Sequence, residues 1–171
     1  MFYNPREKSL ELQTLEELHV RMDLSMSDKQ HLLNLQKGFE GEVLFDRHLE
    51  KMEGNSLILR DLLLKINGRT IQIDTLPILY NTIHLFEVKN FEGNYLYDDG
   101  KMFKFPKHEI INPLNQLERI ETHFRQLLKN LGFHFEVKAS VVFVNPTFTL
   151  YQAPLTHPLF IQLRFNPLCS N

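Results

Sequence analysis

Three residues with acid–base and metal-binding chemistry lie near one another in the middle of the sequence. Asp74 is followed, after twelve intervening residues, by Glu87, and Lys89 comes two residues later. Two neighbouring carboxylates repel each other in the absence of a cation, and such hard oxygen donors suit Mg²⁺ or Mn²⁺. A nearby ammonium group can orient or activate a water molecule and neutralise charge on a phosphate. This set of residues therefore has the groups that metal-assisted hydrolysis of a phosphodiester requires.

Two predicted strands must bring these side chains together. Residues 70–79 alternate between apolar and polar side chains, and residues 83–89 form the next strand. The two-residue period puts Glu87 and Lys89 on one face, and a turn between the strands can bring Asp74 beside Glu87. In the alternative interpretation, that face is exposed to solvent and Asp74 only begins a turn. The apolar flanking runs favour a sheet covered on both faces, where an unpaired Glu or Lys would be costly outside a functional site.

Two helices are predicted ahead of the strands. Residues 1–25 are polar and charged, with apolar residues at Leu10, Leu15 and Leu18, which indicates a short amphipathic helical arm. Ser27, with Gln30 three residues later, forms a capping box for a second helix that runs from Asp28 to about Met52. Two glycines interrupt this second pattern and indicate either a break or the close approach of another backbone.

Strands and a third helix follow. The apolar run 57–66 leads into Asn67-Gly68, a strong hairpin signal. Pro77 predicts a bend, a bulge or a lost pairing within the strand over 70–79. The other predicted elements are a hairpin over 95–105, a helix from Pro113 that Asn112 caps and Gly132 ends, a strand over 133–144 and a last strand over 159–165. This order predicts an α/β or α+β domain with a mixed sheet between helices.

The composition excludes several classes of protein. The 171 residues are 43% hydrophobic and 23% charged, as expected of an ordinary globular domain. The single cysteine, Cys169, excludes a disulfide framework and a multi-cysteine metal site. The sequence has neither G-x-x-x-x-G-K-[ST] nor G-x-G-x-x-G, the glycine-rich motifs that bind the phosphates of nucleoside triphosphates and dinucleotides. No apolar run approaches the roughly 20 residues that cross a bilayer, so we expect a reduced, cytoplasmic protein with no membrane partner.

The charge is unevenly distributed along the chain. The net charge is −2, which argues against a polycation that coats nucleic acid. Residues 1–50 carry 6 Lys/Arg and 10 Asp/Glu, whereas residues 101–171 carry 8 and 4. Lys101, Lys104 and Lys107 alternate with aromatic residues and could hold a phosphate backbone. The same pattern also fits a solvated hairpin with its aromatic rings turned inward.

Four motifs resemble a known family. They are Gly38-Phe39-Glu40-Gly41-Glu42, Gln72-Ile73-Asp74, Phe86-Glu87-Val88-Lys89-Asn90 with Gly93, and Asn112-Pro113-Leu114-Asn115-Gln116. In this order and spacing they resemble the nuclease-related domain, NERD, which is assigned to the PD-(D/E)xK nuclease superfamily. The arm, with Pro5-Arg6, is similar to that of NERD proteins of Bacillus-type bacteria.

The resemblance implies a fold and a division of the chain. The fold would be a restriction-endonuclease-like α/β core, with a mixed central sheet flanked by helices. Residues 1–27 would form the N-terminal helical arm and residues 28–145 the nuclease-like domain. Residues 146–171 would be a C-terminal extension, where the chain could be incomplete.

The resemblance also implies a role for each matching residue. Asp74 and Glu87 would bind Mg²⁺ or Mn²⁺, and Lys89 would be the catalytic lysine. Glu42 would complete the acidic cluster, either as a metal ligand or as a base behind the metal. Gln116 would point into the same cleft.

The expected function is that of a divalent-metal-dependent nuclease that hydrolyses DNA phosphodiester bonds. Water would attack at the carboxylate-bound metal with help from the lysine. The alternative is a catalytically silent module on the same fold that binds nucleic acid or another protein. A further hypothesis is that the arm mediates a homodimer.

Overall fold

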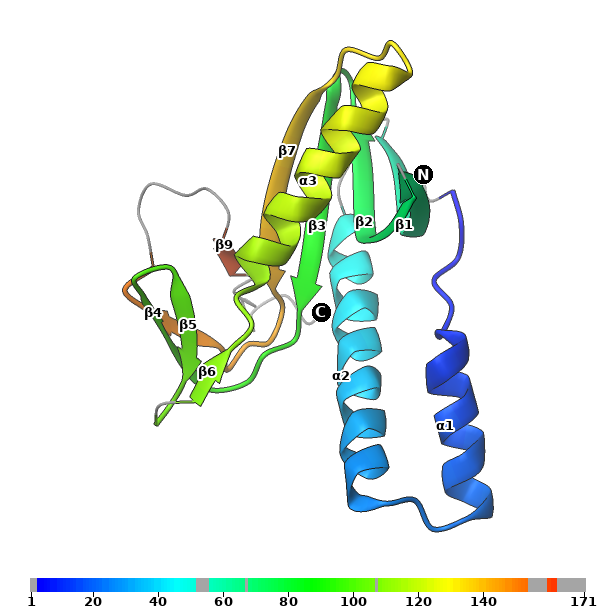
Figure 1. Ribbon diagram of the computed structural model, residues 1–171, viewed down its shortest axis with the longest axis vertical. Helices are drawn as coiled ribbons and strands as arrows, with labels where there is room; N and C mark the ends of the chain where they lie inside the picture. The colour runs from blue at the N-terminus through cyan, green and yellow to red at the C-terminus, as the bar shows by residue number, and fades with distance from the viewer. Residues whose placement is uncertain (1–2, 52–55, 67, 107, 154–159, 163–171) are drawn as a thin grey trace.

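The computed structural model describes residues 3–51, 56–66, 68–106, 108–153 and 160–162. In this part of the chain a five-stranded sheet has a helix on each face, and a four-stranded sheet lies beside it (Figure 1). The helices are α1 (Leu10–Arg21), α2 (Met26–Leu49) and α3 (Pro113–Asn130). The α+β class and the restriction-endonuclease-like core predicted from the sequence are confirmed. None of the helices in the described segments is long and apolar enough to cross a membrane.

The larger sheet has the strand order β1-β2-β3-β7-β9. Its strands are β1 (Ser56–Ile66), β2 (Arg69–Leu79), β3 (Thr82–Lys89), β7 (Glu136–Phe143) and β9 (Phe160–Gln162). The first three strands pair antiparallel, whereas β3–β7 and β7–β9 pair parallel, so the sheet is mixed as predicted. β1 and β2 form the predicted hairpin, although Asn67 lies outside the described residues, as do residues 163–165 of the predicted last strand.

Pro77 has the effect that its chemistry predicts. It faces Ile58 of β1, within a continuous run of pairs from Ser56–Leu79 to Arg60–Thr75. On the other side of β2, pairs with β3 form at Thr75–Phe86 and at Ile78–Ile83, but none forms at Pro77. Because proline has no N–H to donate, the loss of pairing there follows from the residue itself.

Two apolar clusters cover the two faces of this sheet. On one face Leu117 and Phe124 of α3 pack with Val141 of β7. On the other face Phe45 of α2 packs with the adjacent Val142. Consecutive residues of β7 thus serve opposite faces, as the pleat of a strand requires. The sheet is therefore a central layer, with α3 on one side and the C-terminal half of α2 on the other.

Helix α2 begins earlier than predicted. Ser25, and not Ser27, is the N-cap: its Oγ accepts from the Asp28 N–H at 3.1 Å and donates to the Asp28 carboxylate at 2.6 Å. The prediction from Ser27 was wrong because Asp28 supplies the side-chain partner in the first turn that Gln30 was expected to supply. The helix ends at Leu49, short of the predicted end.

The two glycines of α2 differ in their surroundings. A Cβ on Gly41 would lie 2.6 Å from the Cβ of Asn90, just after β3, whereas a Cβ on Gly38 would meet nothing within 4 Å. At Gly41 another segment does approach closely, and its nearest atoms belong to the side chain of Asn90 rather than to a backbone; Gly38 has no such neighbour. Gly41 lets α2 lie directly against the end of β3.

The other helices match their predictions closely. The Asn112 side chain accepts from the Leu114 N–H at 3.0 Å and caps α3, and Gly132 follows the helix with φ +75°. Helix α1 lies alongside the N-terminal half of α2 (Figure 1), where Leu12 and Leu15 pack with leucines of α2, while Leu10 and Leu18 are exposed. The arm thus docks on its own chain, and the homodimer through this arm stays an untested hypothesis.

The sequence predicted a hairpin over 95–105 but not that it belongs to a separate sheet. This sheet has the order β6-β5-β4-β8, with β4 (Asn94–Asp98), β5 (Lys101–Lys104), β6 (His108–Ile110) and β8 (Thr149–Tyr151). Positive φ angles at Asp99 and Gly100 form the predicted turn. Strands of three residues are too short to show an alternating pattern, so β6 and β8 left no recognisable signal.

Candidate active site

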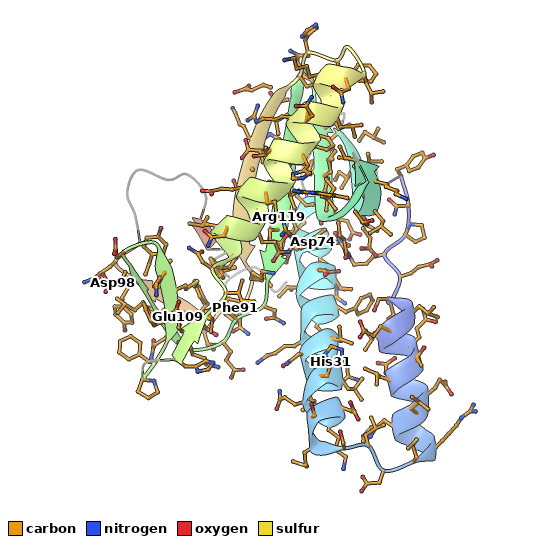
Figure 2. The ribbon with its side chains drawn as sticks, in the orientation of Figure 1. His31, Asp74, Phe91, Asp98, Glu109 and Arg119 are labelled. Carbon is orange, nitrogen blue, oxygen red and sulfur yellow. The ribbon has the colours of Figure 1, made fainter. Side chains whose placement is uncertain are left out.

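The pairing between β2 and β3 opens at Asp74. Thr75–Phe86 is the last backbone pair before the two strands separate. Beyond it, the Asp74 carboxylate accepts from the backbone N–H of Val88 at 2.9 Å, in place of a backbone carbonyl. The side chain is thereby held between the strands, close to the start of α3 and to α2 (Figure 2). The alternative in which Asp74 only begins a turn is wrong.

Glu87 and Lys89 lie on one face of β3, as the strand period predicted. The Nζ of Lys89 donates to a carboxylate oxygen of Glu87 at 2.7 Å. Glu87 is only 3% exposed, so the alternative of a solvent-exposed strand face is wrong for this residue. A buried carboxylate with a single ammonium partner is costly and is characteristic of a functional site.

A polar cavity of about 550 Å³ brings together all five residues that the resemblance named. They are Glu42 from α2, Asp74 from β2, Glu87 and Lys89 from β3, and Gln116 from α3. The cavity is open to solvent, and Gln116 lies at its exposed edge. Asn34, Lys37, Gln72 and Asn90 also line it, and sequence reasoning had assigned none of these a role.

Burial and electrostatic repulsion together perturb the acids of the cavity. Burial, followed by the nearby carboxylates of Glu87 and Glu42, raises the pKa of Asp74 to about 8. The Val88 N–H and the Lys89 ammonium oppose this shift but do not cancel it. Asp74 therefore keeps its proton at neutral pH unless another cation approaches.

The donor set fits a hard divalent cation held by two carboxylates. Mg²⁺ in proteins commonly uses one or two carboxylates together with water and phosphate oxygens, and Asp74 and Glu87 can supply these. The third predicted ligand, Glu42, accepts from Arg6 at 2.7 Å. Consistent with this engagement, no group of three His, Cys, Asp or Glu side chains within the described segments is arranged to hold a metal.

Arg6 is the residue that sequence reasoning missed. Its side chain is 3% exposed and reaches Glu42, Asp46 and the β2 backbone at Asp74. The sequence predicted the Pro5-Arg6 motif only as a feature shared with the arm of NERD proteins and gave Arg6 no chemical role. Its partners lie 36 to 69 residues away along the chain, so no local spacing could reveal them.

Two of the three predicted substrate lysines lie on the smaller sheet and do not line the cavity. Lys101 is on β5 of the smaller sheet and pairs with Glu109 at 3.3 Å. The Nζ of Lys104 lies 6.0 Å from the centre of the Tyr95 ring, and Lys107 is outside the described residues. Neither Lys101 nor Lys104 lines the cavity, and their contact with a substrate stays a prediction.

Comparison with known proteins adds one match. The family model of the nuclease-related domain matches residues 37–144, a span that contains all five predicted site residues. No curated protein and no solved structure matches the chain. The matched region covers more than half of the chain and agrees with the PD-(D/E)xK placement. The chain therefore belongs to the nuclease-related domain, or NERD, family.

Proposed function

We propose that this protein is a divalent-metal-dependent nuclease that hydrolyses DNA phosphodiester bonds in the polar cavity. The observation that carries the proposal is that Asp74, Glu87 and Lys89 line one polar cavity, where burial, and then repulsion from the carboxylates of Glu87 and Glu42, raises the pKa of Asp74 to about 8. A bound divalent cation relieves this repulsion. Membership of a nuclease-related family supports a nucleic acid as the substrate class.

Each side chain has a distinct task in this proposal. Asp74 and Glu87 would hold Mg²⁺ or Mn²⁺, which when bound polarises a phosphate oxygen and makes water a better nucleophile at neutral pH. Lys89 lies 2.7 Å from Glu87, where its ammonium can donate to the attacking water or to the phosphate. Gln116, at the edge of the cavity, can orient the phosphate by hydrogen bonding.

The test is cleavage of linear, circular and single-stranded DNA with Mg²⁺, Mn²⁺ or EDTA. The wild type is compared with Lys89→Ala and with Lys65→Ala, a control that removes an exposed lysine of β1 outside the cavity. We expect cutting that requires metal, is lost in Lys89→Ala and persists in Lys65→Ala. Equal cutting by the wild type and Lys89→Ala would mean that this cavity does not carry the activity.

A second candidate is a catalytically silent nucleic-acid-binding module on the same fold. The ion pair between Arg6 and Glu42 favours it, because it engages one of the three predicted metal ligands. Titration with Mn²⁺ separates the two. The nuclease proposal requires Mn²⁺ binding that Asp74→Ala abolishes, whereas the silent module requires neither this binding nor cleavage.

A further inference from the structure

We infer that Arg6 is a positioning residue of the active site, supplied by the arm from outside the family-matched region. This inference rests on the proposed function, because it assigns Arg6 the task of setting the geometry of the carboxylates that would hold the cation. The matched region begins at residue 37, so the family motif alone does not include Arg6.

The guanidinium of Arg6 makes five hydrogen bonds to four residues. Its Nη1 donates to Glu42 at 2.7 Å. Its Nε and Nη2 donate to the two carboxylate oxygens of Asp46 at 2.7 and 3.2 Å. The Nη2 also donates to the backbone carbonyl of Asp74 at 3.0 Å and to Thr75 Oγ1 at 2.9 Å. One side chain thus joins α2 to β2 at the residue proposed to bind the cation.

These contacts fix Asp74 from two sides. Arg6 holds its backbone carbonyl, and the Val88 N–H holds its carboxylate. Arg6 also sets the position of the Glu42 carboxylate, which lines the same cavity. Side chains that orient metal ligands from behind affect metal affinity without touching the metal. Arg6 acts in this way, through Asp74 and Glu42.

The number and direction of these bonds require an arginine. A guanidinium is a planar fork of five donors, and here it serves a bidentate carboxylate on one side and the β2 backbone on the other. A lysine has a compact ammonium group that cannot reach all four partners at once. Arg6→Lys should therefore keep the charge but lose the positioning.

The arm has a separate anchor, which provides a matched control. The side chain of Asn4 donates to the Arg60 carbonyl at 2.8 Å and accepts from the Arg60 N–H at 3.0 Å. Asn4→Ala removes these bonds and leaves the partners of Arg6 in place. If Arg6 merely attached the arm, Asn4→Ala would have the same effect on the site as Arg6→Gln.

The experiment measures Mn²⁺ affinity and the thermal unfolding of the full chain, together with kcat and KM for DNA. For Arg6→Gln we expect roughly 10- to 100-fold weaker Mn²⁺ binding, a lower kcat and an unchanged KM. Asn4→Ala should lower the unfolding temperature and bind Mn²⁺ like the wild type. Arg6→Lys should also weaken Mn²⁺ binding. This variant serves as the test of the inference if Arg6→Gln does not fold.

Two results would overturn the inference, and they differ from failure of the proposed function. Wild-type Mn²⁺ affinity in both Arg6 variants would show that the residue does not position the ligands. Equally weakened Mn²⁺ binding in Asn4→Ala and Arg6→Gln would show that Arg6 only attaches the arm to the domain. A wild type that binds no Mn²⁺ would instead contradict the proposed function itself, and the inference with it.

Discussion

Replacing Asp74 by asparagine should stabilise the metal-free protein, and the gain should grow with pH. The pKa of Asp74 is raised from 3.8 to about 8 by burial and by the carboxylates of Glu87 and Glu42. Asparagine keeps an oxygen that can accept from the Val88 N–H but has no proton to lose. The variant therefore removes the repulsion and leaves the hydrogen bond that holds the side chain.

The sign and size of the effect follow from proton linkage. The folded state binds the Asp74 proton more tightly than the unfolded state does, so this contribution to stability is complete below about pH 4 and is lost as the pH rises to about 8. One pKa unit corresponds to about 1.4 kcal/mol, so the full shift sets an upper limit of about 6 kcal/mol. Because Asp74 is partly exposed, solvent screening reduces this figure. We expect Asp74→Asn to be about 2–4 kcal/mol more stable than the wild type at pH 8.

The assay is urea unfolding in EDTA at about pH 5 and about pH 8. Asp98→Asn, on an exposed strand end of the smaller sheet, controls for the change in net charge. Adding Mn²⁺ at the higher pH should stabilise the wild type and not Asp74→Asn, since only the wild type retains both carboxylates. A stability difference between Asp74→Asn and the wild type that is the same at both pH values would refute the reasoning.

Three further substitutions test the packing and the ion pairs around the site. Gly41→Ala should cost about 1–3 kcal/mol in urea unfolding, because the new Cβ meets Asn90 at 2.6 Å. Gly38→Ala, in the same helix but in open space, should be neutral or stabilising, and equal losses in both variants would contradict the packing argument. Asp46→Ala should lower the free energy of unfolding by about 3–5 kcal/mol, because it leaves two buried arginines without their shared carboxylate. A loss below about 1 kcal/mol would show that this network behaves like a surface ion pair.

The parts of the fold that were predictable depend on contacts close in sequence. The cap at Asn112, the alternation in β2 and the hairpin at Asp99-Gly100 are each visible within a few residues. The N-cap of α2 was predicted at Ser27 instead of Ser25. The two serines are only two residues apart, and the hydrogen bond from the Asp28 N–H to Ser25 identifies the true cap. The smaller sheet was missed because its pairings join short segments that carry no pattern of their own.

The candidate site divides in the same way. Glu87 and Lys89 are two residues apart, and Asp74 joins them through a hairpin, so the strand period and a turn predicted their convergence. The network around Arg6 depends on docking the arm, α2 and β2 against one another. Such tertiary contacts leave no trace in local spacing, and only the folded structure reveals them.

The shared carboxylate of Asp46 has a consequence for how this family can evolve. It accepts two hydrogen bonds from Arg6 of the arm and forms an ion pair with Arg60 of β1 at 3.2 Å, so loss of this acid would leave two buried arginines without their shared partner. Divergence at these positions must therefore be concerted, through paired replacements or through loss of the whole set. Relatives that lack an arginine at the position of Arg6 should also lack the acid at the position of Asp46. The arm and the domain would then have evolved together, although the family model covers only the domain, residues 37–144.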